Sequence, residues 1–278
     1  MWSEVQILSS RLFLQHEILI TNDDGIQSPA LEALEIALAD LGNITVAAPD
    51  REMSATSHRI TLNQPLRYHQ VAPNRFAVQG TPADCVILAS LRILKGTPAL
   101  VVSGVNRGLN IGDDISYSGT VAAAFEAALQ GIPAIAVSTF AHVEPDNIAA
   151  AQVVARVAAR VLESGLPPDV VLNVNYPADW NGEFRITRQG RRAGKTVLVE
   201  NLDPRGREYF WLHEELHDER EQAVPSGPLT DYEAVAAGYV SISPLQINRT
   251  AQMYFNHFSR WAVQLDLGHK EEVDQEKI

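Results

Sequence analysis

The chain has 278 residues, of which 46% are hydrophobic, enough for one large domain with a substantial core and too many for a disordered protein. Its 34 acidic residues outnumber 22 basic ones, and the formal net charge of -12 argues against a stable nucleic-acid complex or an anionic membrane as partner. A single cysteine excludes an intramolecular disulfide and a cysteine-based zinc site, and no apolar run approaches the roughly 20 residues of a membrane span.

Residues 1–16 are predicted to be an N-terminal extension. They include Glu4 and Arg11, and they lack the basic region and the small-residue cleavage site of a signal peptide. A lone cysteine, Cys85, suits a reducing compartment. Together these features predict a cytoplasmic protein.

From Ile18 onward, short apolar runs rich in β-branched residues alternate with longer runs of helical spacing. This alternation is typical of βαβ units and predicts an α/β fold with a mainly parallel sheet. A helix is predicted after the first strand, with Ser28 as N-cap, Pro29 at its first position and Gly42 as its stop. The predicted strands are 18–21, 44–48, 100–103 and 134–138.

Residues 66–79 predict an antiparallel hairpin around Pro73-Asn74 beside the sheet. A largely buried helix follows, in which Thr81, Pro82 and Asp84 form a capping-box pattern. A catalytic role for Asp84 is the alternative, and the pattern favours the cap. Cys85 lies on the buried face of this helix and is expected in the core.

The second half continues with a helix at 147–163 and a strand at "DVVLNVNYP". Aromatic and β-branched residues then mix with Arg, Gly and Pro, which predicts an antiparallel arm or insertion at 179–230 for contact between subunits. Residues 231–265 return to the helix and strand pattern of the core, and 266–278 form a polar tail. The arm predicts a homodimer or homotetramer.

Three polar loops follow predicted strands of the sheet. They contain "TNDDG", "PDREMSATSH" and "GVNRGLNIGDDISYSGT". The carboxyl ends of parallel strands bind ligands in open α/β sheets, so we expect a site where these loops converge.

Two adjacent carboxylates, Asp23 and Asp24, stand in the first loop. With hydroxyl and amide oxygens nearby they suit a hard divalent cation, Mg²⁺ or Mn²⁺, rather than zinc. The alternative is that both aspartates only cap a turn and the helix after it.

The third loop ends in "YSGT" at the start of a predicted helix. Backbone N–H groups and hydroxyls from Ser118 to Thr120 would bind an anion there, aided by the helix dipole. The alternative is that Ser118 or Thr120 merely caps the helix. A metal site facing an anion site is what hydrolysis of a phosphate monoester requires.

Five motifs in chain order resemble the survival protein E (SurE) family of metal-dependent nucleotidases. The resemblance covers most of residues 18–245 and implies a Rossmann-like three-layer core with the active site in residues 17–178. It also implies a phosphoric monoester hydrolase that converts nucleoside 5'- and 3'-monophosphates to nucleoside and phosphate. The motifs are "ILITNDDGI", "VAAPDREMSA", "VQGTPADCV", "VVSGVNRGLNIGDDISYSGTVAAAFEAAL" and "TDYEAVAAGYVSISPL".

The resemblance places the family's functional residues on this chain. One divalent ion per subunit, Mg²⁺ or Mn²⁺, would be bound by Asp23, Asp24, Ser54 and Asn106. Phosphate would be bound by Asn110, Ser118, Gly119 and Thr120, with Asn22 as a neighbour. Both aspartates would be catalytic: Asp23 acts as a covalent nucleophile, or orients or deprotonates a water molecule, and a metal-engaged carboxylate favours the water.

Competing hypotheses differ in class. A nucleotide-dependent oxidoreductase would carry G-x-G-x-x-G after the first strand, where this chain has "TNDDGIQS". An aspartyl-phosphate phosphatase would carry D-x-D there. A non-catalytic metal and nucleotide sensor on the same scaffold stays as the alternative function. His58 is open to two interpretations, assistance to the leaving group or an ordinary hydrogen bond, and Arg107 likewise contacts phosphate or solvent.

Overall fold

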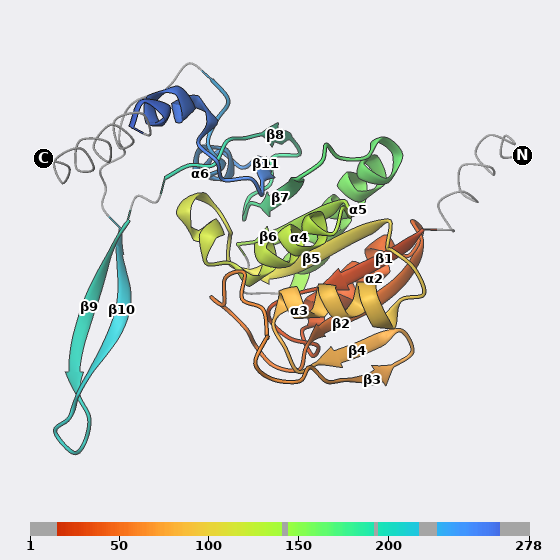
Figure 1. Cartoon of the computed structure of the whole chain (residues 1–278), viewed down its shortest axis with the longest axis horizontal. Helices are drawn as coiled ribbons and strands as arrows, with labels where there is room; N and C mark the ends of the chain where they lie inside the picture. The colour runs from red at the N-terminus through yellow and green to blue at the C-terminus, as the bar shows by residue number, and fades with distance from the viewer. Residues whose placement is uncertain (1–15, 141–143, 192–193, 217–226, 262–278) are drawn as a thin grey trace, which may run out of the picture. The chain divides into compact units, whose positions relative to one another are not determined.

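The computed structural model describes residues 16–140, 144–191, 194–216 and 227–261 (Figure 1). Most of the N-terminal extension and the whole polar tail predicted at 266–278 lie outside the described residues. The chain divides into two compact units, Met1–Ile247 and Asn248–Ile278. Within the described residues, no helix combines the length and apolar character needed to cross a membrane.

A nine-stranded sheet runs through the first unit in the order β3-β4-β2-β1-β5-β6-β7-β11-β8. The six strands from β4 to β7 in this order are mutually parallel, whereas β3 and β11 run antiparallel to their neighbours β4 and β7. The bounds are β1 Glu17–Thr21, β2 Asn43–Pro49, β3 Tyr68–Ala72, β4 Arg75–Val78, β5 Leu100–Arg107, β6 Ala134–Thr139, β7 Val170–Tyr176, β8 Phe184–Ile186 and β11 Val240–Gln246. The predicted strands and the mainly parallel sheet are confirmed.

Helices cover both faces of this sheet, as predicted for a three-layer α/β core. The side chains of β1 alternate between the faces: Ile18 and Ile20 pack with α2 (Pro29–Leu38) and α5 (Glu144–Ser164), while Leu19 packs on the other face with α3 (Pro82–Leu88) and α4 (Gly119–Leu129). Both faces of β1 are therefore buried, which explains its continuous apolar run. Figure 1 shows α3 and α4 in front of the central strands.

The ends of helices α2 and α3 differ from the sequence-based expectation. Helix α2 ends at Leu38, and Gly42 is not its stop. Instead, a Cβ at Gly42 would overlap the carbonyl oxygen of His16, which accepts a hydrogen bond from the Asn43 backbone N–H at 2.8 Å. Gly42 thus permits close approach of the chain entering β1. Helix α3 is shorter than expected and continues as a π-helical segment, Ala89–Ile93.

The predicted antiparallel arm contains a separate two-stranded sheet, β9 (Gly194–Leu202) and β10 (Glu208–Leu216). Strand β8, which precedes it, instead joins the main sheet parallel to β11. Helix α6 (Asp231–Ala236) and strand β11 follow the arm along the chain.

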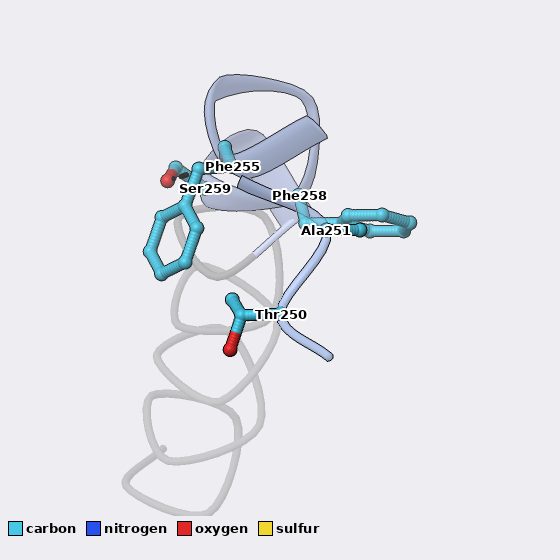
Figure 2. A pocket seen from close by; sticks show the side chains of 5 residues that line it. All are labelled: Thr250, Ala251, Phe255, Phe258 and Ser259. Atoms are coloured by element: carbon cyan, nitrogen blue, oxygen red, sulfur yellow. Dashed lines mark hydrogen bonds between the residues drawn. The ribbon is translucent and has the colours of Figure 1, made fainter. Parts of the chain in front are cut away.

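The second unit contains a 3-10 turn, Gln252–Tyr254. Figure 2 shows a hollow in this unit, and no residue of the predicted site belongs to it. Its lining residues are Thr250, Ala251, Phe255, Phe258 and Ser259.

Candidate functional site

The first polar loop begins at the carboxyl end of β1, where Asn22 closes a tight turn. Its side-chain Nδ2 donates to the Gly25 carbonyl at 3.1 Å, and its Oδ1 accepts from the Gly25 N–H at 3.1 Å. Gly25 has a φ of +94°, and a Cβ there would lie 3.0 Å from the Arg51 backbone. The asparagine therefore closes this turn, and both carboxylates that follow it remain available for other contacts.

Asp23 connects the predicted metal site to the predicted phosphate site. The residue is 3% exposed, and its Oδ1 accepts a 2.5 Å hydrogen bond from the Thr120 hydroxyl at the start of α4. A Cβ at Gly119 would lie 3.0 Å from Asp23 Oδ2, so glycine allows the helix start to approach the carboxylate. Burial raises the pKa of Asp23, while the hydrogen bond from Thr120 acts in the opposite direction.

Asp24 has an oxygen that suits a cation. Within the described part of the chain, its buried Oδ2 has no hydrogen-bond partner. Burial, followed by the charge of Asp23, raises the pKa of Asp24 to about 6, and the nearby Arg107 opposes the rise. An orphaned carboxylate oxygen beside a second carboxylate is the arrangement that a divalent ion would stabilise.

The second loop, after β2, passes these aspartates and reaches the start of α4. The Met53 N–H donates to the Asp23 carbonyl at 2.7 Å, and the Ser57 N–H donates to the Tyr117 carbonyl at 3.0 Å. Ser54 is exposed between these two contacts, with its hydroxyl donating to Glu52 Oε1 at 2.9 Å. The backbone contacts bring the Ser54 loop to both halves of the site.

His58, at the end of this loop, pairs with helix α4. Its Nε2 lies 3.0 Å from Glu126 Oε2, and both side chains are partly buried. Of the two interpretations of His58, the hydrogen-bonding one describes this geometry.

The third loop starts later than expected, because β5 extends through Asn106 to Arg107. Asn106 pairs in register with Ser138 on β6 after a register shift that follows Ser103. Its Nδ2 donates to the Gly108 carbonyl at 2.8 Å, which leaves the amide oxygen for another partner. A register shift of this kind changes the direction in which the following side chains point, here that of Asn106 at the carboxyl end of β5.

Ser118 is the N-cap of α4: its Oγ accepts from the Val121 N–H at 3.1 Å. The Ser118 hydroxyl oxygen therefore caps the helix, as the alternative interpretation held. Its proton can still be donated to an anion. The buried N-terminus of α4 also presents the backbone N–H groups of its first turn.

Asn110 is fixed by three polar side chains that the sequence analysis did not single out. Its N–H donates to Asn175 Oδ1 at 2.9 Å, and its Nδ2 donates to the Ser138 hydroxyl at 2.7 Å. Its carbonyl accepts from Asn173 at 2.7 Å and from Asn175 at 3.1 Å. A signal was present in the sequence, because two asparagines at alternate positions of the apolar run "VVLNVNY" place buried amides on one face of a strand.

Asp84 is a helix cap, as predicted. Its Oδ2 accepts from the Thr81 N–H at 2.8 Å, which completes the capping box, and both of its oxygens also bind Thr61. Cys85 is a fully buried free thiol whose pKa is raised by burial, in agreement with the expected core position.

Within the described residues, no group of three or more His, Cys, Asp and Glu side chains is placed to hold a metal. Only two of the four predicted metal ligands, Asp23 and Asp24, are of these residue types. The other two predicted ligands are the hydroxyl oxygen of Ser54 and the amide oxygen of Asn106. The chemistry of these four donors suits Mg²⁺ or Mn²⁺.

Comparison with known proteins matches residues 18–196 to the family model described as "Survival protein SurE". A "5'-nucleotidase SurE" from Syntrophotalea carbinolica is 47% identical over 250 residues, covering 88% of this chain and 97% of the relative. One from Geotalea daltonii is 45% identical over 251 residues, covering 89% and 99%. The crystal structure of the SurE protein from Aquifex aeolicus superposes with a TM-score of 0.77 at 38% identity, covering 88% of this chain and 99% of that one.

Proposed function

Because the chain belongs to the SurE family, we propose that it is a 5'-nucleotidase, a phosphoric monoester hydrolase that converts nucleoside 5'-monophosphates, and also 3'-monophosphates, to nucleoside and phosphate. The observation that carries the proposal is the 2.5 Å hydrogen bond from Thr120 to Asp23. It joins a carboxylate suited to a cation with a helix N-terminus suited to a phosphate group.

Asp23, Asp24, Ser54 and Asn106 would hold one Mg²⁺ or Mn²⁺ ion per subunit, in keeping with the metal dependence of the family. The orphaned Oδ2 of Asp24 supports this assignment. When bound, the ion would polarise the phosphoryl oxygen and favour ionisation of a water molecule.

The phosphate-binding residues would act around the phosphorus atom. The N–H groups at the start of α4, with the hydroxyls of Ser118 and Thr120, would bind phosphoryl oxygens as charge shifts in the transition state. Asn110, which its amide network holds in place, would bind a further phosphoryl oxygen, and Asn22 shapes the turn that presents Asp23.

Asp23 would orient or deprotonate the attacking water. Its Oδ1 already accepts from Thr120, and a carboxylate engaged in this way is a poor covalent nucleophile. The water oxygen bonds to phosphorus as the bond from phosphorus to the ribose oxygen breaks, and the nucleoside leaves as an alcohol that takes up a proton.

The test is phosphate release from a panel of 5'- and 3'-nucleoside monophosphates, with EDTA or with added Mn²⁺. We expect that EDTA abolishes the release of phosphate and that added Mn²⁺ restores it. Mn²⁺ binding without release from any substrate would contradict the proposal and favour a non-catalytic sensor.

Metal binding should weaken as the solution becomes acidic. Asp24 has a pKa of about 6 without metal, above its ordinary 3.8, so a metal ion must displace a proton from it below pH 6. Mn²⁺ affinity measured by calorimetry at pH 5, 6 and 7 should fall by up to about tenfold per pH unit below 6.

The same raised pKa has the opposite effect on the metal-free fold. Since the folded state binds the Asp24 proton more tightly than the unfolded chain does, stability should increase as pH falls from about 7 towards 4. The unfolding midpoint of EDTA-treated protein should show this increase, and Asp24→Asn should reduce it. An equal increase in both proteins would count against the Asp24 assignment.

We also propose a division of the chain into a core (17–178), an arm (179–230) and a segment that returns to the core (231–265). The arm would make the contacts between subunits in a homodimer or homotetramer. In the arm, Leu198 pairs with Leu212 and Val199 with Trp211, and all four are exposed. Successive strand residues point to opposite faces, so both faces of the β9–β10 sheet are apolar. A two-stranded sheet is marginal alone in water, which favours packing on a second copy.

Leu212→Lys should therefore lower the molar mass measured by light scattering, because it places a charge on this face. The matched control is Leu91→Lys, since Leu91 is 77% exposed in the core unit and Leu212 is 76% exposed. A wild-type monomer, or the same mass change in both variants, would refute the assignment. We also propose a cytoplasmic location, which suits the buried free thiol of Cys85.

A further inference from the structure

A buried carboxylate outside the proposed site connects three distant segments of the chain. Asp231, the first residue of α6, is fully buried. Its Oδ2 accepts from the Gly112 N–H at 2.8 Å, and its Oδ1 accepts from the N–H groups of Gly190 at 2.9 Å and Tyr232 at 3.0 Å. Three backbone donors on one carboxylate make a strong and directional tether.

Gly112 is held at both of its backbone polar groups. Besides the bond to Asp231, its carbonyl accepts from Gln189 Nε2 at 2.8 Å. Its φ is +54°, and a Cβ there would overlap the ring of Tyr232. The residue is thus clamped by the C-terminal part of the first unit.

The clamped residue lies between the two groups of proposed phosphate ligands. Gly112 begins the 3-10 turn Gly112–Ser116, two residues after Asn110, and the turn leads through Tyr117 into Ser118. The amide network on β6 and β7 holds the Asn110 side of this segment, and Ser57 holds its far end through the carbonyls of Ser116 and Tyr117. The Asp231 carboxylate anchors the middle.

We propose that Asp231 is a positioning residue for phosphate binding: through Gly112 it fixes the segment that brings Asn110 and Ser118 to the same phosphoryl group. The inference rests on the proposed function. Asp23 and Asp24 lie on a different segment, after β1, and Asn106 is held within β5 by its pairing with β6, so the effect of Asp231 on phosphate should exceed its effect on metal.

The test compares two binding constants in the full-length Asp231→Asn variant. The amide keeps the shape and one acceptor but turns an NH₂ group towards backbone N–H donors. We expect the inhibition constant of inorganic phosphate and the KM to rise on the order of tenfold, with the Mn²⁺ dissociation constant within about twofold of wild type.

The matched control is Thr230→Ala, which removes the capping box of the same helix and leaves Asp231 in place. It should lose stability without changing the phosphate constant. Gln189→Ala removes the other tether of Gly112 and should weaken phosphate binding to a smaller degree, including in the case that Asp231→Asn does not fold.

Unchanged phosphate binding in Asp231→Asn, or equal loss of phosphate and Mn²⁺ affinity, would overturn the inference. If Asp231→Asn does not fold, an unchanged phosphate constant in Gln189→Ala would overturn it. Wild-type protein that binds neither Mn²⁺ nor phosphate would overturn the proposed function itself, and with it this inference.

Discussion

Asp24→Asn is expected to lower the turnover of nucleoside monophosphates by about a thousandfold or more while the protein stays folded. The substitution keeps the size of the side chain but removes its negative charge. Because Asp24 Oδ2 is buried without a partner among the described residues, the carboxylate contributes no hydrogen bond there that the fold would lose. Its raised pKa also means that a neutral side chain is tolerated at this position.

Turnover measured at saturating Mn²⁺, together with circular dichroism and thermal unfolding, checks this expectation. Asp23→Asn should lose turnover similarly, since Asp23 is a proposed cation ligand and accepts the hydrogen bond from Thr120 at the proposed phosphate site. The matched control is Asp203→Asn, in the exposed turn of the β9–β10 hairpin, which should keep full activity. A fully active Asp24→Asn variant would contradict the site assignment.

Gly104→Ala should destabilise the fold by about 3 kcal/mol or more. Gly104 has a φ of +137°, which side chains rarely adopt. A Cβ there would also overlap the Val137 carbonyl oxygen on β6 and lie 2.7 Å from its Cγ1. Backbone conformation and packing on the neighbouring strand thus both require glycine just before Asn106.

Alanine variants at two other glycines, measured by chemical denaturation, distinguish the effect of backbone conformation from the effect of packing. Gly96 has open space and no positive φ, so Gly96→Ala should change the free energy of unfolding by less than about 1 kcal/mol. Gly108 has a φ of +104° with open space, so Gly108→Ala should fall between the two. Equal stabilities for all three variants would refute the argument.

Helices and strands could be predicted where the local residue pattern itself indicates burial or a helix end. The apolar run around Leu19 identified a strand buried on both faces, and Thr81-Pro82 with Asp84 identified a helix start. Strand β5 was predicted too short because its polar end, "GVNR", resembles a loop. It remains a strand because β6 supplies partners for Asn106 and Arg107, and pairing between distant segments is not visible in either segment alone.

In the candidate site, too, residues in local motifs were predicted, whereas residues that act from distant parts of the chain were not. The local motifs drew attention to Asp23, Asp24 and the "YSGT" helix start, since carboxylates and a helix N-terminus have recognisable chemistry. The residues that support them were missed. Asp231 contacts Gly112 from 119 positions away along the chain, so only the folded structure reveals this tether.

If the site binds a cation and a phosphate as proposed, the bond between Thr120 and Asp23 makes the affinities for these two ligands depend on each other. If a cation draws charge from Asp23, the Thr120 hydroxyl is freer to turn towards an anion, and linkage requires phosphate to strengthen cation binding by the same factor. Inhibition by the product phosphate should therefore become stronger as the concentration of the metal ion rises. Cation affinities measured in phosphate buffer would belong to the ternary complex rather than to the free enzyme.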